Sequence, residues 1–128
     1  MTQPMLLIIA HGSRRQASND EVRTLARRIA NTRHPAIADV EVAFLELAEP
    51  SITDGLARCV AKGAKDILVL PYFLAAGTHV TYDIPEDIAA FCAKHPQMNI
   101  RVTPHLGAAP TLSQAILDLA VSTKAQAA

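Results

Sequence analysis

Short apolar runs alternate with longer amphipathic stretches along the whole chain. Four runs have the length and composition of buried strands, at residues 5–10, 40–45, 67–72 and 100–103. Each is followed by a stretch with apolar residues at helical spacing; in the first, Val22, Leu25, Ala26 and Ile29 recur at i, i+3, i+4 and i+7, which is typical of a helix that buries one stripe. The order βαβαβαβα predicts an α/β fold: a three-layer sandwich with a four-stranded parallel sheet and helices on both faces.

Local signals set the expected helix boundaries. Ser18, Asn19 or Asp20 can cap the first helix, and Ser51 follows Pro50 at the start of the second. Asp83 is expected to cap a third helix that begins near Pro85, after a loop that contains His79. The last helix, at about 110–122, is expected to bury a stripe made of Leu112, Ala115, Ile116 and Leu119.

Composition limits the class of protein. The chain has 128 residues, half of them apolar, with no Trp, so one domain over residues 1–128 with an aliphatic core is expected. A net charge of zero gives no support for nucleic-acid or membrane binding through bulk charge. No segment is long enough to span a bilayer, and the N-terminus lacks the basic region of a signal peptide, so we expect a cytoplasmic protein. Cys59 and Cys92 lack C-x-x-C spacing and are expected to be buried free thiols.

The charges are unevenly distributed. Residues 1–33 hold six arginines against two acids, a net +4, whereas residues 34–58 hold five acids against one arginine, a net −4. Solvated helix faces account for part of this pattern. Arg14 and Arg15, however, lie directly beside His11, where they could meet an anionic ligand.

Two histidines follow predicted strands in the same way. His11 comes directly after the first strand and His79 follows the third. The common strand order 2-1-3-4 places these two strands side by side where the winding reverses, and ligands of open α/β sheets bind there. Glu46 follows the second strand, next to the first, so all three residues should converge. Neutral imidazoles suit divalent Co, Ni, Fe and Zn, and a carboxylate can complete such a site. Histidines also accept protons near neutral pH.

The other three histidines carry weaker signals. His34 and His95 each precede a proline at a helix end, where a C-terminal cap is the expected role. His105 follows the fourth strand at the same sheet edge, and either a site role or a surface role is open to it.

Four sequence pieces together point to a family. They are HGSR at 11–14, FLELAEPSI at 44–52, LPYFLAAGTHVTYDIP at 70–85 and PHLG at 104–107. In this register they resemble the short sirohydrochlorin chelatases of the CbiX/SirB type, over nearly the whole chain. The resemblance implies a chelatase-like fold and insertion of a divalent metal ion into sirohydrochlorin with release of two protons. The metal would be cobalt first, or iron or nickel, in cobalamin, sirohaem or coenzyme F430 biosynthesis.

The resemblance also implies site residues and partners. His11 and His79 would be metal ligands and proton acceptors, and Glu46 an acidic partner that guides the metal or takes a proton. The metal would be a substrate, with no permanently bound cofactor. Longer chelatases have two lobes facing one cleft, so a chain of this length implies a homodimer that encloses the site. No role transfers to His105, where many relatives have another residue.

Sirohydrochlorin carries eight carboxylates around a flat ring, which suggests further contacts. Arg14 could bind one carboxylate in a bidentate manner, and Arg15 could do likewise or point to solvent. Gly12 and Ser13 lead to a helix N-terminus, which favours anions. Gly77, next to Thr78, would let the backbone approach a flat ligand closely. The apolar wall of the cleft could be formed by Leu45, Phe73 and Leu74.

Three other functions fit parts of the pattern. A phosphoryl-transfer enzyme would use His11 as nucleophile and Arg14 on the phosphate, but enzymes similar in outline carry an arginine where this chain has Ala10. A non-catalytic metal carrier or sensor would use the same histidines. A flavodoxin-like binding module is the third alternative.

Overall fold

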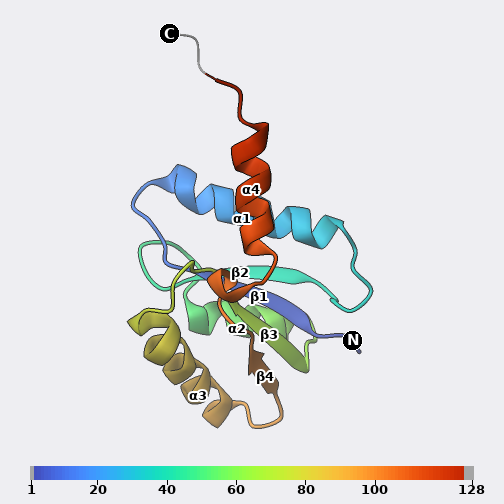
Figure 1. The fold of residues 1–128 in the computed structure, drawn as a ribbon. Coiled ribbons are helices and arrows are strands. Elements are labelled where there is room, and N and C mark those ends of the chain that lie inside the picture. Colours follow the sequence, from blue (N-terminus) through green and yellow to red (C-terminus); the bar gives the residue numbers. More distant parts are fainter. Residues whose placement is uncertain (1, 126–128) are drawn as a thin grey trace.

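The computed structural model of the protein describes residues 2–125 and contains one parallel sheet (Figure 1). Its strands lie in the order β2-β1-β3-β4, so the predicted α/β fold and strand order are confirmed. The elements along the chain are β1 (Met5–Ala10), α1 (Gln16–Asn31), β2 (Val40–Phe44), α2 (Ile52–Ala61), β3 (Asp66–Pro71), the π-helical turn η1 (His79–Asp83), α3 (Ile84–Lys94), β4 (Asn99–Val102), the 3₁₀ turn η2 (Leu106–Ala108) and α4 (Leu112–Ser122).

Helices cover both faces of the central strand β1. Met5, Leu7 and Ile9 point to one face and pack in a cluster with buried residues of α2 and α3. Ile8 and Ala10 point to the other face and pack under α1. An all-apolar run is what a strand buried on both sides requires, and the hydrophobic effect stabilises the sandwich through these two clusters. The predicted helix layers on both faces are present.

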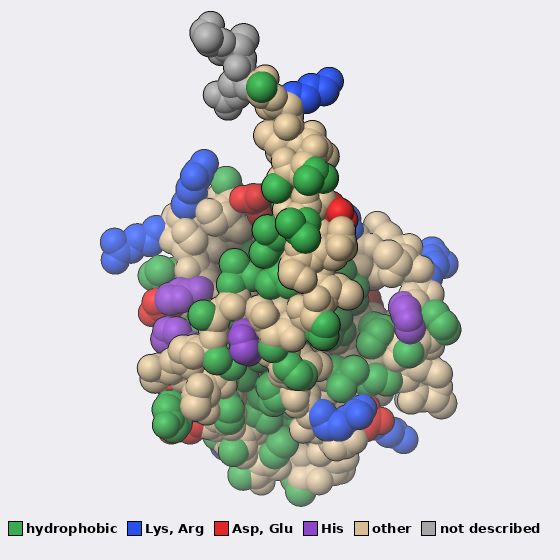
Figure 2. Space-filling model, in the orientation of Figure 1, with side chains coloured by type: hydrophobic (Ala, Val, Ile, Leu, Met, Phe, Trp, Pro, Cys, Tyr) green, Lys and Arg blue, Asp and Glu red, His purple; other side chains and the backbone are tan. Residues whose placement is uncertain are grey.

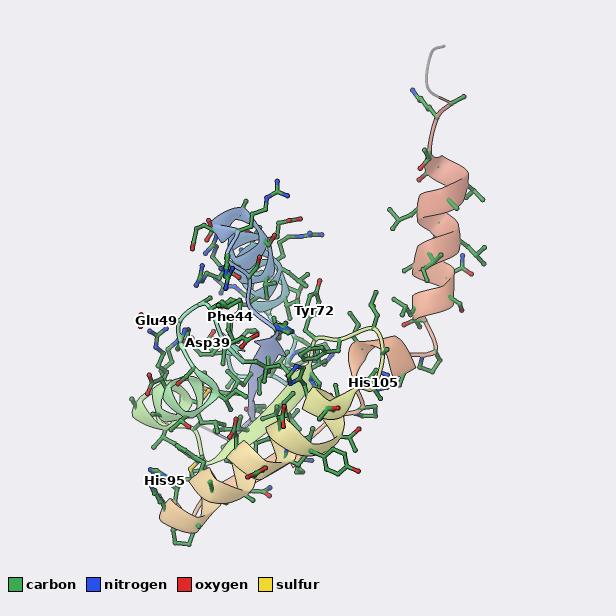
Figure 3. The ribbon with its side chains drawn as sticks, turned by 90° about the vertical axis from the view of Figure 1, so that its left-hand side faces the viewer. Asp39, Phe44, Glu49, Tyr72, His95 and His105 are labelled. Atoms are coloured by element: carbon green, nitrogen blue, oxygen red, sulfur yellow. The ribbon has the colours of Figure 1, made fainter. Side chains whose placement is uncertain are left out.

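Helix α4 differs from the prediction. Its residues Ile116 and Leu119 are 58% and 71% exposed, and no residue of α4 is buried. The helix projects away from the sheet in two perpendicular views (Figures 1 and 3). Leu68 and Leu70, which lie on the α1 side of β3, consequently stay half-buried. The periodicity identified an apolar stripe correctly, but periodicity carries no information about which surface covers a stripe.

Several element ends differ from expectation by a residue or two. The strand predicted at 40–45 ends at Phe44, and β3 and β4 each lie one residue earlier than predicted. Helix α1 begins at Gln16, before the predicted caps, and Arg15 precedes it without a side-chain capping bond. Ser51 does cap α2, because its hydroxyl accepts a hydrogen bond from the Asp54 amide at 3.2 Å.

The two histidines predicted as helix caps have different outcomes. His95 ends α3, where its ring stacks on Phe91 with centroids 4.0 Å apart. His34 lies beyond the end of α1 and instead accepts a hydrogen bond from the Ala36 amide through Nδ1, so the prediction of a cap there is wrong.

Both cysteines are free thiols, but only Cys59 is fully buried, whereas Cys92 is half-buried. Among residues 2–125, no helix combines the length and the apolar character needed to cross a membrane.

Candidate functional site

The adjacent ends of β1 and β3 bring His11 and His79 face to edge. His11 is the first residue after β1, and His79 is the first residue of η1. Their ring centroids lie 5.1 Å apart with an angle of 87° between the ring planes. Histidine side chains gather beside an acidic side chain on one side of the molecule (Figure 2). Two residues that are 68 positions apart in the sequence (from 79 − 11) thus meet at the sheet edge where ligands of such folds bind.

Glu46 joins them because Gly12 allows two segments to approach closely. After β2 ends, the chain still follows β1: the Leu45 amide donates to the Ala10 carbonyl at 3.0 Å and the Glu46 amide to the His11 carbonyl at 3.1 Å. Gly12 has φ = +94°, and a Cβ there would lie 1.8 Å from the Glu46 carbonyl oxygen. This approach leaves His11 Nε2 2.9 Å from Glu46 Oε1, within hydrogen-bond distance.

A buried asparagine shapes the other side of the HGSR loop. Asn19 is 2% exposed and forms two hydrogen bonds with the Ser13 backbone, accepting from its N–H at 2.9 Å and donating to its carbonyl at 2.8 Å. Both bonds satisfy polar groups that would otherwise be buried without partners. Asn19 therefore fixes the loop between β1 and α1 and does not cap α1.

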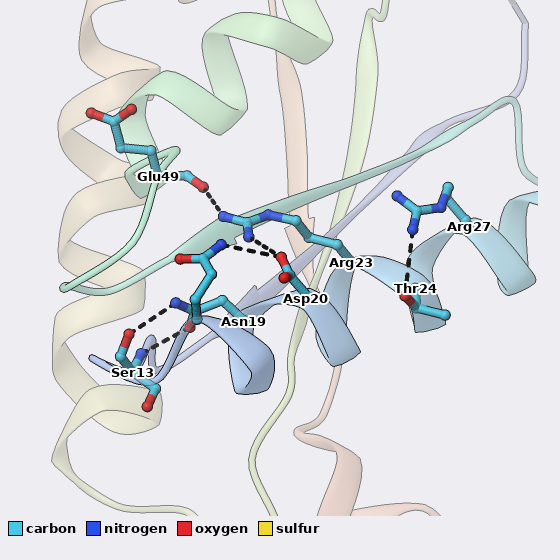
Figure 4. Close-up of polar contacts among 8 residues, drawn as sticks. Ser13, Asn19, Asp20, Arg23, Thr24, Arg27 and Glu49 are labelled. Carbon is cyan, nitrogen blue, oxygen red and sulfur yellow. Dashed lines mark hydrogen bonds and ion pairs between the residues drawn. The ribbon is translucent and has the colours of Figure 1, made fainter.

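Arg23 of α1 secures the segment that carries Glu46. Its guanidinium donates to the Glu49 carbonyl at 2.8 Å and to Asp20 at 2.9 Å, as the close-up in Figure 4 shows. The same group lies 5.0 Å from the centre of the Phe44 ring, at cation–π distance. The segment from 44 to 50 is thus held to α1 at one end and to β1 at the other.

His79 lies in a helical turn, where the sequence predicted a loop. The amide of Ile84 bonds the His79 carbonyl and closes the π-helical turn η1. Asp83 was predicted to cap α3, but it has helical φ and ψ and makes no capping bond. Its Oδ2 instead accepts from His79 Nδ1 at 2.6 Å. Sequence reasoning missed this contact, although the spacing of four residues between a histidine and an aspartate on a helix was its signal.

Each imidazole is therefore paired with one carboxylate, and both pairs are open to solvent. The exposed fractions of the side chains are 48% and 58% for His11 and Glu46, and 45% and 44% for His79 and Asp83. In the part of the chain that the structure describes, no group of three or more His, Cys, Asp or Glu side chains is arranged to hold a metal ion. The site offers two facing imidazoles and carboxylates beside them, with open positions for other ligands.

The spacing of the two rings suits a shared metal ion. With metal–nitrogen bonds of about 2.0–2.1 Å, an ion lies about 3.2 Å from the centre of each imidazole that ligates it. For two ring centres that are 5.1 Å apart, the angle at such an ion is about 105°, close to tetrahedral. The distance between the ring centres therefore permits both imidazoles to ligate one ion once the side chains rotate from their perpendicular arrangement.

A cavity of about 320 Å³ adjoins the histidine pair. It is lined by Leu45, Glu46, His79, Asp83, Glu86 and Asp87. Phe73 stands beside it, with its ring centroid 6.4 Å from that of His79. Two of the three predicted apolar wall residues thus lie at the site, and the third, Leu74, is 72% exposed.

The loop between β3 and η1 packs against the segment that follows β4. The Gly107 amide donates to the Phe73 carbonyl at 2.9 Å, and a Cβ at Gly107 would collide with the Leu74 backbone. Gly77 in the same loop has no atom within 4 Å of its Cβ position, so nothing in the described protein requires a glycine there. Thr78 precedes η1, is exposed and makes no side-chain capping bond.

The remaining predicted site residues lie at the surface. Arg14 and Arg15 are exposed, and neither forms an ion pair with any residue from 2 to 125. The Ser13 hydroxyl accepts from the Arg15 amide at 3.0 Å, so it stabilises the entry to α1. His105 lies where the chain turns toward α4 (Figure 3), and its carbonyl accepts from the Ala108 amide in η2.

Known proteins resemble this chain in sequence and in fold. The chain is 32% identical over 102 residues to a sirohydrochlorin ferrochelatase of Bacillus subtilis, an alignment that covers 80% of this chain and 38% of the relative. The chain thus spans less than half the length of that relative. A crystal structure of a putative cobalamin biosynthesis CbiX protein from Marinobacter aquaeolei superposes with a TM-score of 0.79 at 31% identity, covering 92% of this chain and 94% of the other.

A longer protein contains the same unit. The sirohydrochlorin chelatase SirB from Bacillus subtilis subspecies spizizenii, solved in complex with cobalt, matches with a TM-score of 0.83 at 28% identity. The match covers 94% of this chain and 51% of SirB. The model of the CbiX family matches residues 5–123, nearly the whole chain. The chain therefore belongs to the CbiX family.

Proposed function

We propose that this protein is a sirohydrochlorin chelatase, which inserts a divalent metal ion into the tetrapyrrole and releases two protons. The observation that carries the proposal is the facing pair of His11 and His79, with centroids 5.1 Å apart at the switch point of the sheet. Relatives named as ferrochelatases and a cobalt complex of SirB support the reaction class.

The two imidazoles can serve both halves of the reaction. Neutral imidazole nitrogens bind first-row divalent ions, and they can also accept the two protons that leave the pyrrole nitrogens. Glu46 contacts His11 directly and can receive a proton from it or guide the incoming ion. We therefore assign His11 and His79 as metal ligands and proton acceptors, and Glu46 as their acidic partner.

The surface around the pair suits an anionic, flat substrate. Arg14 and Arg15 are exposed, follow His11 closely in the sequence and form no ion pair within residues 2–125, and Arg14 is proposed to bind a substrate carboxylate with Gly12 and Ser13 beside it. Gly77, whose Cβ position has no atom within 4 Å, is proposed together with Thr78 to let the flat ring approach the backbone closely. The apolar part of the wall is assigned to Leu45, Phe73 and Leu74.

The metal ion is a substrate, and cobalt is proposed first, ahead of iron or nickel. A protein named for iron and a structure holding cobalt are both among the relatives. Two imidazoles with carboxylates accept all three ions, so supply in the cell decides between cobalamin and sirohaem synthesis. Free thiols at Cys59 and Cys92 suit the reducing cytoplasm, which is the proposed compartment.

We propose that two copies of the chain form a homodimer that closes the site. The chain matches about half of SirB, so a second copy would supply an equivalent of the remaining half. Both the stripe of α4 and the α1 side of β3, with Leu68 and Leu70, present apolar area that lacks a cover among residues 2–125. A second copy offers matching apolar surfaces in both places, and burial of such area drives association.

Metal insertion tests the reaction. Sirohydrochlorin is mixed anaerobically with Co²⁺, Fe²⁺ or Ni²⁺, and insertion is followed by absorbance with the native chain, His11→Ala and His79→Ala. Acceleration by the native chain that is lost in both variants is expected. No acceleration over the protein-free reaction with any of the three ions would overturn the proposal, and metal binding without insertion would identify a carrier or sensor.

Sedimentation equilibrium tests the dimer. Ile116→Glu combined with Leu119→Glu should shift the native dimer to monomer, because two charges then replace the apolar stripe. Gln114→Glu on the same helix is the matched control and should remain dimeric. A native chain that is monomeric at all concentrations used in the insertion assay would contradict the dimer.

A further inference from the structure

We infer that Asp83 is the positioning residue of the site, which holds the His79 ring in one tautomer so that Nε2 faces the incoming metal. This inference rests on the proposed metal-binding role of His79. The geometric basis is the hydrogen bond of 2.6 Å between His79 Nδ1 and Asp83 Oδ2, the shorter of the two histidine–carboxylate contacts at the site.

The carboxylate fixes the position of the proton on the ring. An ionised aspartate can only accept hydrogen bonds, so the bonded nitrogen, Nδ1, must carry the hydrogen. Neutral imidazole has one N–H, which leaves Nε2 with a free lone pair for a metal ion or a proton. Carboxylates that bond the second nitrogen of a ligating histidine orient metal sites in this way.

The local fold supplies the alignment. His79 and Asp83 are the first and last residues of η1, and the turn closes through the bond from the Ile84 amide to the His79 carbonyl. Single π-helical turns inside helices occur frequently at functional sites. The turn lies at the start of α3, whose buried residues Ile84 and Ile88 anchor it to the core. Asp83 is therefore placed by the backbone at the edge of the His79 ring.

No structural role competes for this side chain. Asp83 makes no capping bond to α3, and within residues 2–125 its carboxylate has no hydrogen bond or ion pair other than that with His79. Glu46 cannot replace it, because Glu46 contacts His11, and does so through Nε2. Asp87 lines the same cavity but makes no hydrogen bond to His79.

The test compares Asp83→Ala with Asp87→Ala, which removes the same charge from the same cavity. Nitrogen-15 shifts of the His79 ring are recorded in metal-free protein at about pH 8.5, where an ordinary imidazole is neutral. The native chain and Asp87→Ala should show the Nδ1–H tautomer, and Asp83→Ala a mixture of both tautomers. Titration with Co²⁺ alone should give a dissociation constant raised about 10- to 100-fold in Asp83→Ala, and raised far less in Asp87→Ala.

Two results would overturn the inference: an unchanged His79 tautomer in Asp83→Ala, or equal losses of Co²⁺ affinity in the two variants, which would show a general charge effect. Thermal unfolding and the backbone amide spectrum confirm that each variant is folded. A native chain that binds Co²⁺ through His79 but inserts no metal into sirohydrochlorin would refute the proposed function and leave the role of Asp83 intact.

Discussion

Gly12→Ala is the substitution for which the structure gives the sharpest expectation. The new methyl group would lie 1.8 Å from the carbonyl oxygen of Glu46 and 3.4 Å from the Cβ of Phe44. The backbone at this position has φ = +94°, which side-chain-bearing residues rarely adopt. The variant must therefore move either the HGSR loop or the segment after β2, and both carry a residue of the site.

The size of the effect follows from two costs. Forcing alanine into a positive φ costs about 1–2 kcal/mol. Relief of the overlap requires a shift of more than about 1 Å, and overpacking of this kind costs about 1–3 kcal/mol. The sum, about 2–5 kcal/mol, corresponds to a fall in the melting temperature of about 6–20 °C for a chain of this size. A shift of that size would also break the contact of 2.9 Å between His11 and Glu46.

Differential scanning calorimetry and Co²⁺ titration check both consequences. Gly77→Ala is the matched control, since its Cβ position is empty and its φ is not positive. We expect that control to keep the native melting temperature and Co²⁺ affinity. A Gly12→Ala protein with native melting temperature and native Co²⁺ affinity would refute the argument that Gly12 sets the approach of Glu46 to His11.

Three further predictions concern the scaffold. Arg23→Met should lower the free energy of unfolding, measured by urea unfolding, by about 1–2 kcal/mol, because the Glu49 carbonyl loses its donor. The control Arg27→Met removes only a 3.4 Å contact with Thr24 and should change this free energy little. Burial raises the pKa of the Cys59 thiol to about 12, so this thiol should react poorly at pH 8. In a Cys92→Ser variant, a chromogenic disulfide reagent should therefore leave Cys59 unmodified until guanidinium unfolds the chain. The hydrogen bond to Asp39 raises the pKa of Lys62. Burial alone would raise the pKa of Asp39, but the hydrogen bonds from the Val40 amide and from Lys62 outweigh burial and lower that pKa. The contribution of Lys62 to the free energy of unfolding is therefore fully present below pH 10.5 and is lost as the pH rises through the pKa of Lys62 in the folded chain. The contribution of Asp39 is present above pH 3.8 and is lost as the pH falls through the pKa of Asp39 in the folded chain. Lys62→Met should therefore flatten both limbs of the stability–pH curve, by at most about 1 kcal/mol for such exposed groups, and unchanged limbs in urea titrations would contradict this.

The fold could be predicted because its signals are local. A six-residue apolar run such as Met5–Ala10 fits a strand covered on both faces, and the alternation of such runs with amphipathic stretches leaves few topologies once crossovers must be right-handed. The convergence of His11, Glu46 and His79 then followed from the strand order alone. Ends of elements were less predictable, because Asn19 can cap a helix or bond a preceding loop, and only the path of the HGSR segment decides between these.

The parts that could not be predicted depend on contacts between segments. Gly12 carries no local sign that a carbonyl 34 residues away will lie against it (from 46 − 12). Asp83 fits the sequence rule for a helix cap, yet η1 continues into α3 without a break, so no free amides need it there and its carboxylate turns to His79. A residue such as Asp83, which has a strong local preference for capping a helix, can therefore bond a neighbouring side chain of the site when no free amide needs a cap.

The exposed stripe of α4 connects the fold to the proposed homodimer. Sequence periodicity required that Ile116 and Leu119 be covered, and the single chain leaves them open. The histidine pair is open as well, with about half of each imidazole in contact with solvent. The proposed metal insertion would need a cleft that excludes water from a flat ring, and the single copy leaves the histidine pair open. In the proposed homodimer, a second copy would cover the apolar stripe and supply an opposite wall, so loss of dimerisation in the α4 variant should reduce insertion while leaving the His11–His79 pair itself unchanged.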